Sequence, residues 1–311
     1  MTNDPSLSMT RRNLIAGGMA ATMLGGCATR PEVAKLDIKT DDFVNVEGLR
    51  LRYAMAGSGR PVVCIHGASG NLGDWTFGPF HQVAATRRAI TFDRPGLGLS
   101  DPAEPVEDLF RQAAVLRAAT RKLGHDKVTL IGHSYGGAVA LAWALDAPET
   151  VDGMLLLAAV SQIWEGSVGG IYDWLNAPMI GPMVARAVPF LATDARIAAS
   201  LESIFAPQAP PEGYLDHFHP ELTLQNGVIR RNARQMGALK SQIAAMAPRY
   251  PTLAMPIEVL HGTADYLVPI AIHSERLVEQ VTTARLTRLE GIGHMPHHTA
   301  TGDMLAALAR L

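Results

Sequence analysis

The sequence contains little cysteine, little net charge and no long apolar run, and each shortage excludes a class of protein. Its 311 residues include two cysteines, Cys27 and Cys64, and neither lies in a Cys-x-x-Cys or Cys/His spacing typical of zinc sites. Two cysteines so placed cannot form the disulfide framework of a small secreted domain. The formal net charge is −2, which offers no basic surface to nucleic acid. We therefore expect no structural metal, no disulfide and no nucleic-acid partner.

The N-terminal segment has the pattern of an export signal. Arg11 and Arg12 precede LIAGGMAATMLGG, a run of 13 uncharged residues that has the length of a signal core and is too short to span a bilayer comfortably. TRRNL resembles a twin-arginine export signal, and LGGC, which ends at Cys27, resembles the bacterial lipoprotein box. We expect residues 1–26 to be cleaved, Cys27 to be lipidated, and residues 27–42 to tether the exported protein to a membrane of the bacterial cell envelope, on the periplasmic side. The alternative is a cysteine that follows an ordinary leader.

From residue 43 the sequence alternates short apolar runs with amphipathic stretches, which predicts a sheet covered by helices. FVNVEGLRLRYAMAG predicts two antiparallel strands that turn at Glu47 and Gly48. PVVCIHG is a continuous apolar run closed by glycine, as in a strand buried on both faces, and Cys64 is expected inside it as an unreactive small side chain. Further strands are predicted in RAITFDRPG, KVTLIGHS, VDGMLLLAAV, IEVLHGTAD and ARLTRLEG.

The alternation stops between residues 161 and 250. Three stretches there have helical spacing and are separated by proline: IYDWLNAPMIGPMVARAVPFLA, DARIAASLESIFA and GVIRRNARQMGALKSQIAAMA. We expect a helical insertion that divides an α/β core into residues 43–160 and 251–311. Most of its large apolar side chains are expected to pack between the insertion and the core, namely Ile163, Trp164, Ile171, Trp174, Leu175, Met179, Met183, Phe190, Ile204 and Phe205.

One short stretch at a predicted strand-to-helix junction has the pattern of a nucleophile elbow. In Gly132-x-Ser134-x-Gly136 the glycines would let strand and helix approach a serine held in a strained backbone conformation. The alternative is a tight turn without chemistry. With GHSYGG in this context, the sequence resembles the α/β-hydrolase fold family. The resemblance implies a mostly parallel central sheet with helices on both faces and an inserted helical cap.

The other groups that such a serine needs also follow predicted strands, where catalytic residues of open α/β sheets lie. A serine hydroxyl needs a base, and His294 follows the last predicted strand, the position that the family uses for its catalytic histidine. His297 and His298 are competitors. The three histidines together also suggest a metal site, but they lack a helical frame and a clear third ligand.

The orienting acid is expected after the penultimate strand, where Asp265 lies. A carboxylate there would hold the far imidazole nitrogen of His294, and the chain order Ser134, Asp265, His294 is the order expected for this fold. Asp93 is the fallback acid, although we expect it to hold the DRPGLGLSD loop instead.

An acyl-transfer site also needs N–H donors for the developing oxyanion. The backbone N–H of Tyr135, directly after the serine, is one candidate. The resemblance assigns the second to the backbone N–H of Ala68, in the loop after PVVCIHG. His66 and Gly67 are expected to shape that loop.

Serine at the elbow separates this chain from haloalkane dehalogenases and epoxide hydrolases of the fold, which place aspartate there. The resemblance implies a cofactor-free serine hydrolase that cleaves a carboxylic ester or lactone through an acyl-serine intermediate. The alternatives are a carbon–carbon bond hydrolase or an amidase on the same residues, and a noncatalytic lipid-anchored binding protein. The apolar insertion favours a neutral, partly hydrophobic ester, whereas Arg230, Arg231 and Arg234 would suit an acidic substrate if they faced it.

Overall fold

The computed structural model describes residues 42–311, with the exception of residue 168. The expected export signal, Cys27 and nearly all of the tether therefore lie outside the described residues. None of the helices in the described part of the chain combines the length and the apolar composition that a membrane span requires.

Eight strands form one sheet in the spatial order β1-β2-β4-β3-β5-β6-β7-β8. The first pair turns at Glu47 and Gly48 and is antiparallel, β2 is antiparallel to β4, and all later neighbours are parallel. The predicted α/β class with a mostly parallel sheet is confirmed. The strands are β1 (Asp42–Val46), β2 (Leu49–Ala56), β3 (Pro61–Ile65), β4 (Arg88–Phe92), β5 (Val128–His133), β6 (Val151–Leu157), β7 (Ile257–Gly262) and β8 (Ala284–Leu289).

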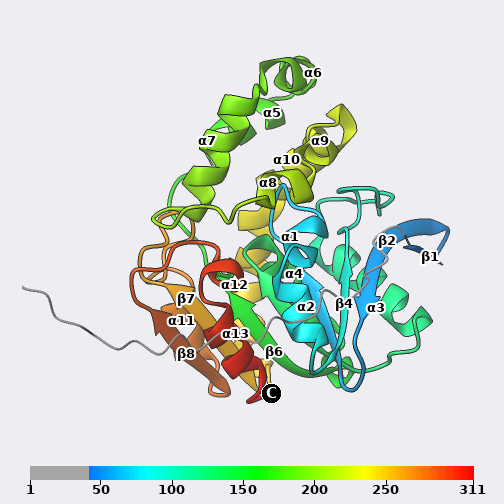
Figure 1. The fold of residues 1–311 in the computed structure, drawn as a ribbon, viewed down its shortest axis with the longest axis vertical. Helices are drawn as coiled ribbons and strands as arrows, with labels where there is room; N and C mark the ends of the chain where they lie inside the picture. The colour runs from blue at the N-terminus through cyan, green and yellow to red at the C-terminus, as the bar shows by residue number, and fades with distance from the viewer. Residues whose placement is uncertain (1–41, 168) are drawn as a thin grey trace, which may run out of the picture. The chain divides into compact units, whose positions relative to one another are not determined.

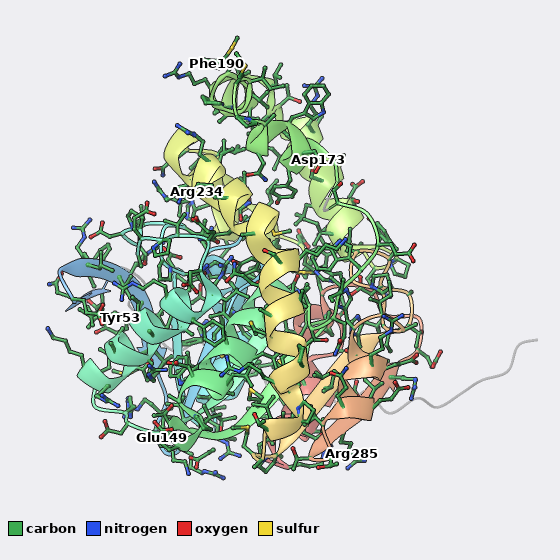
Figure 2. All side chains as sticks on the ribbon, turned by 180° about the vertical axis from the view of Figure 1, so that it is seen from behind. Tyr53, Glu149, Asp173, Phe190, Arg234 and Arg285 are labelled. Atoms are coloured by element: carbon green, nitrogen blue, oxygen red, sulfur yellow. The ribbon has the colours of Figure 1, made fainter. Side chains whose placement is uncertain are left out.

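Helices cover both faces of this sheet (Figures 1 and 2). On one face α3 (Leu109–Lys122), α4 (Tyr135–Asp146) and α11 (Ser274–Gln280) contribute to a large apolar cluster with alternate strand residues. On the other face a second cluster contains Trp75, Phe80 and Met304. These side chains come from α1 (Gly73–Thr76), α2 (Pro79–Ala84) and α13 (Thr301–Leu308), next to α12 (Pro296–Thr299).

The predicted helical insertion lies between β6 and β7, and Figure 1 shows its helices beyond one end of the strands. Its last helix is long, and Leu239, Ile243 and Met246 near the end of that helix belong to the core cluster. The end of the insertion therefore packs on the core. The insertion comprises α5 (Ile171–Asn176), α6 (Gly181–Leu191), α7 (Asp194–Phe205), α8 (Tyr214–Phe218), α9 (Pro220–Thr223) and α10 (Asn226–Met246).

The expectation that most large apolar cap residues pack against the core is wrong. Phe205 is fully buried, but Met179 is 89% exposed and Phe190 is 88% exposed. These two residues lie just before and inside α6, a short helix that begins at a Gly-Pro pair, contains Pro189, and contacts α5 and α10 of the cap. One side of α6 therefore does not pack against the sheet. Seven of the ten residues are exposed, namely Ile163, Ile171, Trp174, Met179, Met183, Phe190 and Ile204.

Candidate active site

Ser134 joins β5 to α4 in a backbone conformation that side chains rarely adopt. Its φ is 53° and its ψ is −118°, and such positions cost about 1–3 kcal/mol unless the surroundings hold them. The surroundings here require glycine, because a Cβ at Gly136 would lie 2.2 Å from the carbonyl oxygen of Ile65 and one at Gly132 would lie 2.6 Å from the Cα of Gly137. Glycine at these two positions thus lets helix and strand approach closely, and the tight turn between them presents Ser134.

His294 and Asp265 meet across the loops that follow β8 and β7. His294 Nδ1 lies 2.7 Å from Asp265 Oδ2. The other carboxylate oxygen of Asp265 accepts hydrogen bonds from the backbone N–H groups of Leu267 and Val268, each at 2.9 Å. The carboxylate is therefore held on both oxygens, and it can fix the orientation of the imidazole.

A second histidine supports the same carboxylate and was not identified from the sequence. His261 Nε2 lies 3.2 Å from Asp265 Oδ2 and 2.7 Å from the carbonyl oxygen of Val268. Burial by itself would raise the pKa of Asp265, but hydrogen bonds from His261 and His294 hold that pKa well below its ordinary value. Asp265 is therefore ionised at neutral pH. The four-residue spacing between His261 and Asp265 in HGTAD is the sequence feature that could have indicated this contact.

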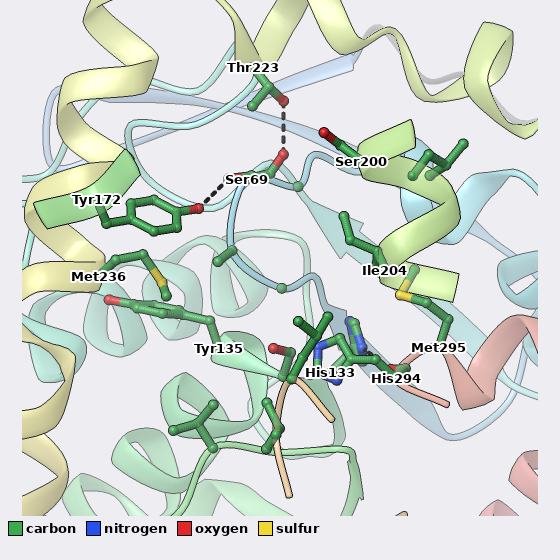
Figure 3. Close-up of a pocket in the computed structure, with 18 of the residues that line it drawn as sticks. Ser69, His133, Tyr135, Tyr172, Ser200, Ile204, Thr223, Met236, His294 and Met295 are labelled. Atoms are coloured by element: carbon green, nitrogen blue, oxygen red, sulfur yellow. Dashed lines mark hydrogen bonds between the residues drawn. The ribbon is translucent and has the colours of Figure 1, made fainter. Parts of the chain in front are cut away.

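Ser134 and His294 both line one cavity with a volume of about 1260 Å³. Among the described residues no hydrogen bond links the Ser134 hydroxyl to the imidazole, as is common in sites without substrate. Figure 3 shows His294 and His133 on one side of this cavity and Tyr135 and Met236 on another. Most of the lining is apolar and comes from both the core and the cap.

His133, the residue before Ser134, contacts His294. Its Nε2 lies 2.8 Å from the carbonyl oxygen of His294, and the two rings are 4.9 Å apart. Burial, together with the neighbouring His297 and His294, holds the pKa of His133 well below its ordinary value. A neutral His133 can donate one hydrogen bond and so fix the backbone at His294.

The other two candidate histidines bind a different carboxylate. His297 and His298 both bind the buried carboxylate of Asp74, and the closest contact, from His298 Nε2, is 2.9 Å. Tyr214 of the cap donates its hydroxyl to the same carboxylate at 2.8 Å. Within the described range, Asp74, His133 and His297 are close enough to hold a metal ion, a set that differs from the three histidines considered in the sequence. The carboxylate already has donors on both oxygens.

Ala68 and Tyr135 both line the cavity next to Ser134. Neither backbone N–H takes part in the turn and loop hydrogen bonds of the described residues. Each therefore remains free to donate to a bound group.

The loop residues behind these donors are buried and bonded to backbone. His66 Nδ1 lies 2.9 Å from the carbonyl oxygen of Gly67, and His66 Nε2 accepts the backbone N–H of Arg94. Asp93 accepts hydrogen bonds from the backbone N–H groups of Leu72 and Leu99. It is therefore not the acid that orients His294. It holds its own loop, as expected.

The cationic cluster on α10 does not face the cavity. Arg231 donates to the carbonyl oxygen of Gly96, and Arg234 pairs with Glu107 at 2.6 Å. None of Arg230, Arg231 and Arg234 is among the cavity-lining residues. The two arginines that do line it, Arg196 and Arg276, were not identified from the sequence.

The comparisons with known proteins agree with this geometry. The family model described as alpha/beta hydrolase fold matches residues 60–301. The chain is 28% identical over 268 residues to an uncharacterized protein of Mycobacterium tuberculosis, an alignment that covers 83% of this chain and 77% of the relative.

Two solved structures share the fold over most of their length. A meta-cleavage product hydrolase from Pseudomonas fluorescens IP01 is 22% identical, with a TM-score of 0.65 over 86% of this chain and 96% of that one. An esterase from Exiguobacterium antarcticum is also 22% identical, with a TM-score of 0.66 over 87% of this chain and 98% of that one.

Proposed function

We propose that this chain, which belongs to the alpha/beta hydrolase fold family, is a serine hydrolase that cleaves a carboxylic ester or lactone. The observation that carries the proposal is that the strained Ser134 opens into the same cavity as the hydrogen-bonded pair of His294 and Asp265. A nucleophile, a base and an orienting acid in one cavity are the groups that acyl transfer needs.

In the first half of the reaction the Ser134 hydroxyl attacks the carbonyl carbon of the ester. Its proton passes to His294 Nε2, while Asp265 stabilises the imidazolium through Nδ1–H. The new oxyanion accepts hydrogen bonds from the backbone N–H groups of Ala68 and Tyr135. The carbon–oxygen bond to the alcohol then breaks, the alcohol takes the proton from His294, and an acyl-serine remains.

In the second half a water molecule repeats the attack on the acyl-serine. His294 takes a proton from the water, and the same two N–H groups hold the second oxyanion. The bond to Ser134 then breaks, the serine oxygen recovers the proton from His294, and a carboxylic acid leaves.

The lining of the cavity supports a neutral, partly hydrophobic substrate. Apolar side chains such as Met236, Ile204 and Met295 dominate it, and burial of apolar groups supplies most of the affinity in such pockets. A carbon–carbon bond hydrolase is the second candidate, since Arg196 and Arg276 lie in the lining and the fold is shared with a meta-cleavage product hydrolase.

The test is turnover of p-nitrophenyl acetate and butyrate, with labelling by a fluorophosphonate probe. Ser134→Ala should abolish both, whereas Ser200→Ala, a change at an exposed serine that lines the same cavity, should retain both. Anilides and a vinylogous 1,5-diketone acid in parallel assays would identify an amidase or a carbon–carbon hydrolase. A wild-type protein that neither turns over any of these nor reacts with the probe would support a noncatalytic binding protein.

The proposed location outside the cytoplasm rests on residues 10–27 alone. Lipidation at Cys27 would hold the protein at a membrane, because two or more acyl chains give stable attachment. Cys27→Ser should move the protein from the membrane fraction to the soluble fraction of its host, with Cys64→Ser as the matched control. Unchanged fractionation would contradict the lipid anchor.

A further inference from the structure

Beyond the three residues of the proposed mechanism, the core contains a buried cation, Arg94, two residues after β4. Arg94 is 0% exposed, and in the described part of the chain no carboxylate forms an ion pair with it. Its side-chain hydrogen bonds go to neutral oxygens, two from side-chain amides and two from the backbone. A buried charge without an ionic partner is unfavourable because it loses its hydration. The four hydrogen bonds offset part of this cost, and their acceptors show which segments the cation holds in place.

The guanidinium is held in one orientation. Its Nη1 donates to Gln112 Oε1 at 2.7 Å and to Gln235 Oε1 at 2.9 Å. Burial lowers the pKa of Arg94 to about 10, so the group stays charged at neutral pH. Gln112 lies in the core helix α3 and Gln235 lies in the cap helix α10, so both parts of the fold keep the cation in place.

The remaining donors bind the loop that carries one expected oxyanion donor. Arg94 Nε donates to the carbonyl oxygen of His66 at 3.1 Å, and Nη2 donates to the carbonyl oxygen of Gly67 at 3.0 Å. The carbonyl of Gly67 and the N–H of Ala68 belong to the same planar, trans peptide unit, so they point in opposite directions. Because the Gly67 carbonyl points to Arg94, the Ala68 N–H points away from it, and Ala68 lines the cavity whereas Arg94 does not.

The same guanidinium also contacts the residue that carries the other donor. Its central carbon lies 4.2 Å from the centre of the Tyr135 ring, and Gln112 Nε2 donates to the Tyr135 hydroxyl at 3.2 Å. The ring is 1% exposed, so the side chain cannot swing away. One buried cation thus contacts both segments that provide N–H groups beside Ser134.

We propose that Arg94 is a positioning residue for the oxyanion hole: it fixes the Ala68 and Tyr135 N–H groups, and its positive charge stabilises the oxyanion through them. The inference rests on the proposed function. Its physical basis is that the hydrogen bond to the Gly67 carbonyl polarises the same peptide whose N–H faces the substrate. A charge in a dry interior acts more strongly than it does in water, and it needs no reorganisation during the reaction.

The experiment compares Arg94→Gln with wild type in three measurements on the full chain. For p-nitrophenyl butyrate, kcat should fall by about 100-fold, the usual loss when one oxyanion donor is removed, while KM changes less than threefold. Affinity for a trifluoromethyl ketone, which forms an oxyanion on Ser134, should fall in parallel. Affinity for the corresponding secondary alcohol, which forms none, should stay the same. Arg249→Gln is the matched control, since Arg249 lies over Phe110 and donates to the carbonyl of Leu145 away from the cavity.

Gln235→Glu covers the case in which Arg94→Gln fails to fold. This variant keeps the guanidinium and its hydrogen bonds but places a carboxylate 2.9 Å from Nη1, which offsets the positive charge. We expect kcat and trifluoromethyl ketone affinity to fall together by about tenfold, with KM and the secondary alcohol unaffected. The inference is overturned if a folded Arg94→Gln or Gln235→Glu protein binds the ketone as wild type does. A wild-type protein that shows no turnover and no probe labelling would instead overturn the proposed function.

Discussion

The core and the outer cap differ in how far their side chains are buried. Ser134, Asp265 and His294 are 6–7% exposed, and the last two are joined by a 2.7 Å hydrogen bond. On the cap, Met179 and Phe190 are almost fully exposed. The proposed catalytic residues are thus held by the sheet and its loops, whereas much of the outer cap surface is exposed among the described residues. A substitution on the exposed part of the cap is therefore expected to disturb the buried residues little.

Several polar contacts connect the two regions, including those of α10 described above. Tyr214 donates to the buried Asp74, Asn71 donates to the carbonyl oxygen of Phe218 at 2.7 Å, and Thr223 donates to the carbonyl oxygen of Ser69 at 2.8 Å (Figure 3). These contacts lie at the base of the cap, near the cavity. Three predictions test how firmly the core and the outer cap hold their side chains.

The largest effect is expected from Asp265→Asn on the core side. The amide cannot stabilise the imidazolium and favours the wrong tautomer of His294, so kcat for a short ester should fall about 10³- to 10⁴-fold. Asp173→Asn, which changes an exposed aspartate of α5 bonded to Ser167, should leave kcat within twofold of wild type. Stopped-flow or steady-state assays with p-nitrophenyl butyrate measure both. Retention of a tenth or more of wild-type kcat in Asp265→Asn would contradict the assigned role.

The second test lies within the cap and compares two phenylalanines. Phe205 is fully buried and packs against Tyr214 and His298 with ring centres 5.1 and 5.6 Å apart, so Phe205→Ala should cost about 3–5 kcal/mol of unfolding free energy. Phe190→Ala, at the exposed end of α6, should change it by less than about 0.5 kcal/mol. Urea denaturation followed by tryptophan fluorescence measures both. Equal losses would show that the outer cap is as firmly packed as its base.

The third test uses acid, because the core buries histidines in the neutral form. Burial is the main cause that lowers the pKa of His66 to about 3 and those of His273 and His297 to about 4, whereas an unfolded histidine titrates near 6.5. The unfolded chain therefore binds more protons below pH 6.5, and stability falls as the pH drops from about 6.5 towards 4. Each group contributes up to about 1.4 kcal/mol per pH unit in that window.

Urea denaturation at pH 7.5 and pH 5.0 measures this loss, and His273→Gln should reduce the difference between the two pH values by about 1–2 kcal/mol. His273 is the suitable position because its Nδ1 accepts the backbone N–H groups of Ser161 and Gln162, which a glutamine oxygen can also do. An unfolding free energy that is equal at both pH values would contradict the burial of neutral histidines.

Much of the fold could be predicted because the signals are local. The strands β3, β5, β6 and β7 are apolar runs buried on both faces, and short continuous runs of this kind predict buried parallel strands. The positions of Ser134, Asp265 and His294 followed from the rule that active groups lie at strand ends. In the structure, Asp265 and His294 form a hydrogen bond beside the cavity that Ser134 lines.

Other features depend on which segments meet in space, and the sequence contains no local signal for them. The partners of Arg94 come from the loop after β3 and from α3, α4 and α10. The buried group around Asp74 joins residues more than 200 positions apart. The exposure of the cap helices was mispredicted for the same reason, since an amphipathic pattern shows that a helix has an apolar side but does not show whether anything covers it.

The sequence by itself determined the order of strands and helices, the strained serine turn and the chain order of the three expected catalytic residues, because each depends on side-chain pattern and on steric limits within a few residues. The tertiary structure decided the rest. It selected His294 over His297 and His298 as the partner of Asp265, it placed Arg94 behind the expected oxyanion donors, and it left one side of the cap exposed. Hydrogen bonds, burial and charge act between segments that are distant in the chain, so their outcome exists only once the sheet has assembled.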